Sequence, residues 1–130
     1  PLFGWYLKKI GCISIDRNKI SKENLNFSDE VSKVIKNTNK TLIIFPQGTR
    51  KNFDDRSTFK KGFARIYNDL EIACLPVAIN SGKVWPKNGR LISNQHITVS
   101  ILNILHPGKE QNKLATEVEQ VIYNELDKIS

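Results

Sequence analysis

Residues 41–45 (TLIIF) form a near-continuous apolar run. Such a run fits a strand covered on both faces, which is typical of parallel sheets flanked by helices. Pro46 and Gly48 follow at once and end the run. The run therefore predicts an α/β protein in which a buried strand delivers the segment FPQGTR, residues 45–50, to the carboxyl edge of a sheet.

The rest of the chain alternates short apolar runs with helical stripes. The apolar runs predict three further strands, at residues 10–15, 73–79 and 97–105. Apolar residues at helical spacing predict three helices, within residues 25–35, 59–70 and 114–129. Because strands alternate with helices, we predict a single α/β domain over residues 1–130, with a mixed, largely parallel sheet and flanking helices.

Two groups of residues carry expectations about burial. Cys12 and Cys74 each lie in an apolar run, so we expect buried free thiols in a reducing compartment. Neither has neighbours at a zinc-binding spacing, so no metal site is expected. The aromatic residues Phe3, Trp5 and Tyr6 leave two interpretations open, a contact with lipid or an acyl chain, and simple burial in the core.

The charge of the chain is positive and evenly distributed. With 20 basic and 13 acidic residues, the formal charge is +7, and no block of like charges occurs. A distributed positive surface suits an anionic partner such as a phosphorylated metabolite or an anionic membrane, although it also serves solubility alone. The aromatic residues are not interleaved with the basic ones as a stacking platform requires, so no nucleic acid partner is expected.

Two arginines are expected where predicted strands end, Arg17 after residues 10–15 and Arg50 after residues 41–45. Ligands of open α/β sheets gather at this edge. A guanidinium binds a phosphate or carboxylate through two parallel hydrogen bonds, and Gly48 lets backbone N–H groups approach the same anion. Two interpretations remain open, an anion site and arginines that cap a carbonyl or pair with an aspartate.

Four segments, in this order and approximate spacing, resemble the glycerolipid acyltransferase family: GCISIDR at 11–17, FPQGTR at 45–50, FKKG at 59–62 and LPVAINSG at 75–82. Within that family the chain is most similar to bacterial-type 1-acyl-sn-glycerol-3-phosphate acyltransferases. The likeness covers the first residues to about Gly82 and weakens beyond it. The resemblance implies the α/β fold of the glycerol-phosphate acyltransferases.

The resemblance also implies an activity. Such an enzyme moves a fatty acyl chain from acyl-CoA or acyl carrier protein to the free hydroxyl of lysophosphatidic acid, giving phosphatidic acid in phospholipid biosynthesis. The acyl thioester is a co-substrate, and no cofactor is implied. The implied partners are lysophosphatidic acid, the acyl thioester, acyl carrier protein as one of the two donors, and an anionic membrane surface on the cytoplasmic side.

In that family the arginines of the second and third motifs bind the glycerol phosphate, a role that the resemblance assigns to Arg17 and Arg50. Gln47, Gly48 and Thr49 belong to the same phosphate-binding segment. Thr49 either donates its hydroxyl to the phosphate or caps the next turn. Relatives usually carry glutamate where this chain has Gln47, so a hydrogen-bond acceptor is kept and a base or anion is lost.

Three residues outside the hexapeptide carry further expectations. The proline of the fourth motif maps to Pro76 and is associated with the acyl-donor side of the site. Lys60 and Lys61 either extend a basic funnel toward the phosphate or form a solvated helix face.

The family's catalytic H-x4-D motif, a general base and its orienting partner, is absent from this sequence. His96 is followed five positions later by Ile101, and His106 by Gln111. We therefore assign no catalytic residue and expect an amino-terminally truncated piece of an acyltransferase that is inactive as it stands. The alternative is a noncatalytic basic α/β module that binds a phosphorylated lipid or metabolite.

Overall fold

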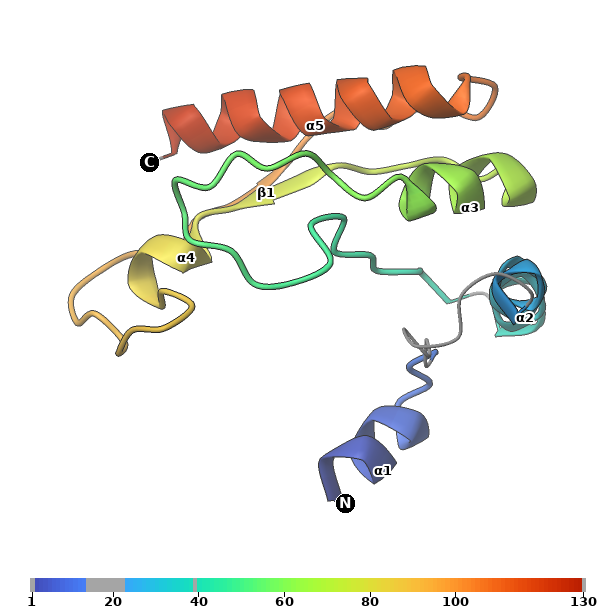
Figure 1. Ribbon diagram of the computed structural model, residues 1–130, viewed down its shortest axis with the longest axis horizontal. Coiled ribbons are helices and arrows are strands. Elements are labelled where there is room, and N and C mark those ends of the chain that lie inside the picture. The colour runs from blue at the N-terminus through green and yellow to red at the C-terminus, as the bar shows by residue number, and fades with distance from the viewer. Residues whose placement is uncertain (1, 14–22, 39, 130) are drawn as a thin grey trace. The chain divides into compact units, whose positions relative to one another are not determined.

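The computed structural model describes residues 2–13, 23–38 and 40–129, drawn as a ribbon in Figure 1. The chain divides into two compact units, Pro1–Leu42 and Ile43–Ser130. The prediction of one domain over residues 1–130 stays a prediction. In the described part of the chain, no helix combines the length and apolar character that crossing a membrane requires.

The first unit begins with helix α1, Leu2–Lys9, which the sequence analysis did not predict. Gly11 ends this helix at φ +85, and the N–H of Cys12 donates to the carbonyl of Leu7 at 2.9 Å. This 6→1 hydrogen bond behind a left-handed glycine is a Schellman cap. Gly11 is thus a helix terminator, and the predicted strand at 10–15 is wrong over its described residues, 10–13.

Side chains at this end of the chain are more exposed than predicted. Cys12 is exposed because it follows a helix cap instead of lying in a strand. Trp5 and Tyr6 are also exposed, so the interpretation of these two as core residues is wrong. The predicted helix within residues 25–35 is confirmed as α2, Glu23–Thr38.

The second unit contains three helices and a two-stranded sheet. Its elements are α3 (Gly62–Leu70), β1 (Val77–Ile79), α4 (Ser81–Val84), β2 (Val99–Ile101) and α5 (Gln111–Lys128). The strands pair antiparallel, Val77 with Ile101 and Ile79 with Val99, and a single bridge joins Cys74 to Leu105. The predicted α/β class is confirmed at this level, and the parallel arrangement stays a prediction.

The core of this unit lies beneath α5, which covers both α3 and β1 (Figure 1). Leu114 and Val118 of α5 are almost fully buried, as are Tyr67 of α3 and Ala78 of β1. These positions follow the helical stripes predicted from the sequence. Glu110 caps the start of α5, where its carboxylate accepts hydrogen bonds from the N–H groups of Asn112 and Lys113.

Residues 41–45 do not form the predicted strand. A strand needs a neighbour that accepts and donates its backbone hydrogen bonds, and no described residue pairs with this segment in a ladder. Ile43 and Phe45 are largely exposed. The apolar run at 41–45 is therefore not a strand, and the predicted strand at this position is wrong.

Candidate functional site

The hexapeptide at 45–50 forms a tight turn. The N–H of Gly48 donates to the carbonyl of Phe45 at 3.0 Å, with Pro46 at the second position of the turn. Gly48 has φ +70, a left-handed conformation that glycine adopts without the penalty of a Cβ. The proline and the glycine thus make the turn that the sequence predicted, and Gln47, Thr49 and Arg50 are presented around it.

Lys60 lies against this turn. Its N–H donates to the carbonyl of Pro46 at 2.8 Å. A Cβ built on Gly48 would lie 3.5 Å from Lys60 Cγ, so the lysine side chain passes directly over the glycine. The second and third resembling segments are therefore in contact, as a shared anion site requires.

Helix α5 contacts the turn and the segment that follows it. The Tyr123 hydroxyl donates to the carbonyl of Ser57 at 2.6 Å, and Gln47 Nε2 approaches the same hydroxyl at 3.5 Å. Glu119 Oε2 accepts from the N–H of Phe59 at 2.6 Å. The segment between the turn and α3 is thereby tied to one face of α5.

Burial also changes the pKa of the Tyr123 hydroxyl. It raises the pKa of the hydroxyl above its ordinary value, an effect that the hydrogen bond from Gln47 partly opposes. The hydroxyl therefore remains a donor to Ser57 through the neutral pH range. Tyr123 was not predicted from the sequence, where its only signal is an aromatic residue with a polar tip beside the apolar stripe of the last helix.

The two arginines of this region, Arg50 and Arg56, differ in their contacts. Arg56 lies over the rings of Phe53 and Tyr123, 5.3 Å from each centroid, and pairs with Asp127 at 2.8 Å. Arg50 is exposed, and none of the residues that the structure describes forms an ion pair or hydrogen bond with its guanidinium.

Asp55 also has partners other than Arg50. Asp55 pairs with Lys51 at 3.1 Å and accepts from the N–H of Ser57, and these contacts lower the pKa of its carboxyl. Arg56 and Lys51 thus fill the structural roles proposed as the alternative for Arg50. Within the described residues, Arg50 has positive charge and solvent access at the rim of the turn.

The two lysines before α3 contact different parts of the unit. Lys61 Nζ donates to Asn112 Oδ1 at 2.9 Å, at the start of α5, whereas Lys60 covers the turn. Lys61 is also the N-cap of α3, where its side chain makes no capping hydrogen bond, and the first turn of α3 has no acidic residue. The amino end of a helix carries partial positive charge, so this end adds to the positive potential beside the turn.

The remaining predicted site residues lie apart from the turn or outside the described part. Pro76 precedes β1, where its carbonyl accepts from the N–H of Leu102 at 3.0 Å, and no backbone hydrogen bond among the described residues joins it to the turn. Arg17 lies outside the described residues. His96 and His106 are exposed residues outside helices and strands.

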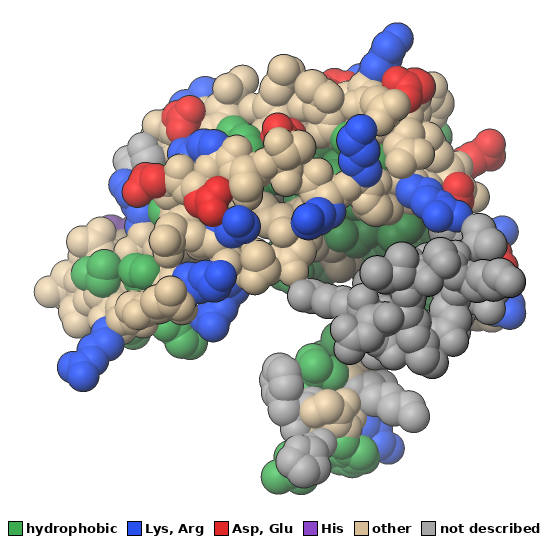
Figure 2. Space-filling model, viewed as in Figure 1, with side chains coloured by type: hydrophobic (Ala, Val, Ile, Leu, Met, Phe, Trp, Pro, Cys, Tyr) green, Lys and Arg blue, Asp and Glu red, His purple; other side chains and the backbone are tan. Residues whose placement is uncertain are grey.

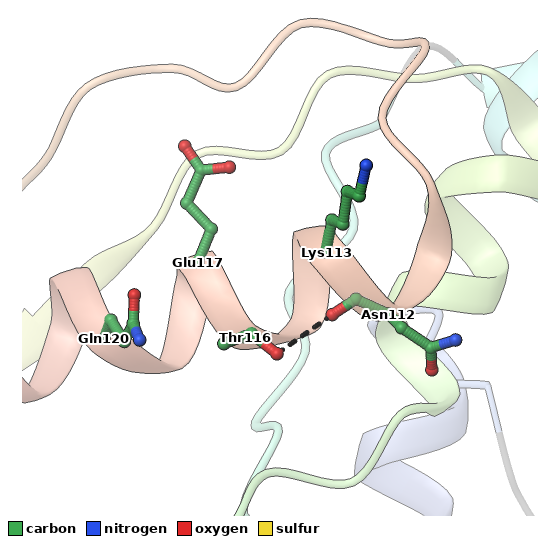
Figure 3. Close-up of a pocket in the computed structure, with 5 residues that line it drawn as sticks. All are labelled: Asn112, Lys113, Thr116, Glu117 and Gln120. Atoms are coloured by element: carbon green, nitrogen blue, oxygen red, sulfur yellow. Dashed lines mark hydrogen bonds between the residues drawn. The ribbon is translucent and has the colours of Figure 1, made fainter.

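A shallow depression on α5 contains none of the predicted site residues. Asn112, Thr116 and Gln120 line it together with Lys113 and Glu117, all from one face of the helix (Figure 3). Glu117 already pairs with Lys109 at 2.6 Å. Because one exposed helix face supplies every lining residue, this depression offers no convergent groups for chemistry.

Comparison with known proteins decides the family. The model of the family described as Acyltransferase matches residues 1–80, which is more than half of the chain. The chain belongs to the acyltransferase family. The matched region contains the turn, Lys60 and Pro76.

Curated relatives of this chain bear a more specific name. Proteins named 1-acyl-sn-glycerol-3-phosphate acyltransferase are 28% identical over 92% of the chain in Pseudomonas aeruginosa and 29% identical over 93% in Cocos nucifera. A relative of the same name in Streptococcus pneumoniae is 28% identical over 78% of the chain. The chain spans 46%, 40% and 35% of these proteins, respectively. No solved structure gives a significant match.

Proposed function

We propose that this chain is the phosphate-binding part of a 1-acyl-sn-glycerol-3-phosphate acyltransferase, which acylates lysophosphatidic acid to phosphatidic acid. Membership of the family and the printed names of three relatives support this activity. The single observation that carries the site is the contact between the glycine turn and Lys60, with Arg50 exposed at the rim.

The phosphate of the acceptor is proposed to lie over the turn. Arg50 offers two parallel N–H donors, and Lys60 adds a second positive charge close to Gly48. The left-handed glycine has no side chain of its own between the backbone and a bound anion. The amino end of α3 and the hydroxyl of Thr49 add further donors, and Arg17 is proposed as the second phosphate-binding arginine.

Gln47 is proposed to position the turn rather than to act as a base. A neutral amide neither accepts a proton at physiological pH nor attracts a cation. Its nitrogen faces the hydroxyl of Tyr123, so its contact runs toward α5. A glutamate here would place a negative charge beside the acceptor's phosphate, which the amide avoids.

The acyl transfer itself is proposed to follow the family's chemistry. The acceptor hydroxyl attacks the thioester carbonyl of acyl-CoA or acyl carrier protein, a C–O bond forms, the C–S bond breaks, and the thiol leaves with a proton. This sequence contains no H-x4-D motif, so the residues described here bind and orient the phosphate. Pro76 is proposed to lie on the acyl-donor side and Lys61 at the outer edge of the basic surface.

The setting of the enzyme is part of the proposal. We propose that β1 and β2 belong to a larger, mixed and largely parallel sheet and that the protein works at the cytoplasmic surface of an anionic membrane. The formal charge of +7 supports an anionic surface as partner. No cofactor beyond the acyl thioester is proposed.

Acyl transfer from labelled acyl-CoA to lysophosphatidic acid tests the function. It is measured on the full-length protein, for the wild type, Arg50→Gln and the control Lys113→Gln. We expect Arg50→Gln to raise KM for lysophosphatidic acid about tenfold or more, because a charge-assisted pair is lost, and Lys113→Gln to change nothing.

Each result separates the candidate functions. Phosphatidic acid formation with the expected rise in KM supports the acyltransferase. Lysophosphatidic acid binding that depends on Arg50 without any product supports the noncatalytic module instead. Equal kinetics for both variants contradict the phosphate role of the turn.

A further inference from the structure

The connection between β1 and β2, residues 80–98, forms an ordered loop that includes α4; it is called the β1–β2 loop below. Its base is fastened by Asn80, which is only 5% exposed. The Asn80 side chain accepts from the N–H of Thr98 at 2.7 Å and donates to the carbonyl of Ile129 at 2.9 Å. Both ends of the loop are therefore tied to each other and to the residue that follows α5.

Internal contacts fix the shape of the loop further out. The N–H of Ile92 donates to the carbonyl of Val84 at 2.8 Å, which closes the loop at a second level, and Val84 is buried. Gly89 turns back on Pro86 with a 3.2 Å hydrogen bond, and a Cβ at Gly89 would lie only 3.1 Å from Pro86 Cβ. The side chains that this loop presents are thus held by a defined backbone.

The loop presents large apolar side chains to solvent. Trp85 is 60% exposed, Leu91 66% and Ile92 47%. The region around α4 projects from one end of the layer formed by β1 and α5 (Figure 1). Exposed apolar groups gathered on a projecting, ordered loop commonly mark an interaction surface.

The charged side chains of this loop are all basic. Lys83, Lys87 and Arg90 are exposed, and none of them forms an ion pair within the described residues. The sequence has no aspartate or glutamate between Glu71 and Glu110. In Figure 2 the projecting region around α4 shows green and blue side chains together and no red ones.

We propose that the β1–β2 loop is a docking element for the interface of an anionic lipid bilayer. Tryptophan is favoured at the depth of the lipid headgroups, and leucine and isoleucine gain by leaving water for the acyl region. Lysine and arginine around them are attracted to anionic headgroups. This combination fits a membrane surface better than nucleic acid, for which an apolar aliphatic tip offers no recognition.

The inference concerns the membrane and is independent of the phosphate site. It requires only that the loop enters lipid, whether or not the turn binds lysophosphatidic acid. Vesicles that lack lysophosphatidic acid therefore test it alone.

Tryptophan fluorescence locates the inserted element. The chain has two tryptophans, Trp5 on α1 and Trp85 in the loop, and both are exposed. In Trp5→Phe, we expect the emission of Trp85 to shift to the blue on phosphatidylcholine–phosphatidylglycerol vesicles and to be quenched by brominated acyl chains. An unchanged emission of Trp85, or a shift seen only in Trp85→Phe, overturns the proposal because α1 or no element then enters the lipid.

Vesicle cosedimentation measures the contribution of each group of residues. Lys87→Gln/Arg90→Gln should weaken binding about 20- to 30-fold, at about fivefold per charge, while the charge-matched control Lys36→Gln/Lys113→Gln weakens it much less. Trp85→Ala/Leu91→Ala should weaken binding at least about tenfold, while Ile101→Ala, on the sheet and 71% exposed, should not. Equal losses in a loop variant and its control overturn the proposal, since nonspecific charge or apolar exposure then explains binding.

Discussion

The N–H of Lys60 donates a 2.8 Å hydrogen bond to the carbonyl oxygen of Pro46. This bond joins the turn at 45–50 to the start of α3, two segments that the sequence separates by a polar loop. It holds the Lys60 side chain over Gly48, so the positively charged side chain lies directly against a glycine that has no Cβ. The proposed phosphate site rests on this arrangement.

Gly48→Ala should destabilise the chain by about 1–2 kcal/mol, because an L-residue with a Cβ is strained at φ +70. Urea unfolding measures the loss. Gly62→Ala is the matched control, since Gly62 starts α3 with no atom within 4 Å of its Cβ position, and it should be neutral or slightly stabilising. Equal stability of Gly48→Ala and the wild type would show that the turn differs from the one described.

Tyr123→Phe should cost about 0.5–1.5 kcal/mol of unfolding free energy. The substitution removes the hydroxyl that donates to Ser57 but keeps the ring, whose edge-to-face contact with Phe59 has a centroid distance of 5.1 Å. Tyr6→Phe, on the exposed face of α1, is the control and should have no effect. If both variants unfold at the same urea concentration, the hydroxyl does not tie the 51–60 segment to α5.

Leu114→Ala should destabilise the second unit by about 2–5 kcal/mol, because Leu114 is fully buried beneath α5 and its loss leaves a cavity. Ile104→Ala removes a similar amount of side chain at a half-exposed position and should change stability by about 0.5 kcal/mol or less. Circular dichroism during thermal unfolding compares the two. A smaller loss for Leu114 than for Ile104 would place the core elsewhere.

The cap of α5 should make stability depend on pH. Hydrogen bonds from the N–H groups of Asn112 and Lys113 lower the pKa of Glu110 below its ordinary value of 4.5. A lowered pKa stabilises the folded state above pH 4.5, and this stabilisation is lost as the pH falls through the folded-state value. Glu110→Gln keeps an acceptor that does not ionise, so the stability difference between wild type and variant should shrink in acid. A difference that stays constant from neutral to acidic pH would contradict this role.

Helices α3 and α5 of the second unit could be predicted from the sequence because their information is local, whereas the short helix α4 was not predicted. Leu114, Val118 and Leu126 recur at helical spacing, and the structure buries all three under one helix face. The turn was predictable for the same reason, since proline and glycine restrict the backbone at their own positions. Arg17 could be named from its motif alone, and its role stays a prediction.

Pairing and supporting contacts could not be predicted in the same way. An apolar run such as 41–45 does not reveal whether another strand pairs with it. Gly11 ends a helix at a position where a strand was predicted. The link from Tyr123 to Ser57 joins residues 66 positions apart, and no local pattern records it. The sequence therefore identified the turn at 45–50, and the structure shows what holds it.

Titration of the chain with glycerol 3-phosphate, followed by amide chemical shifts, tests whether the turn at 45–50 binds a phosphate. We predict shifts centred on Gly48, Arg50 and Lys60, and an affinity about tenfold weaker in Arg50→Gln than in the control Lys113→Gln. Shifts that avoid these residues, or equal affinities in the two variants, would contradict the claim that this turn binds the phosphate of the acceptor.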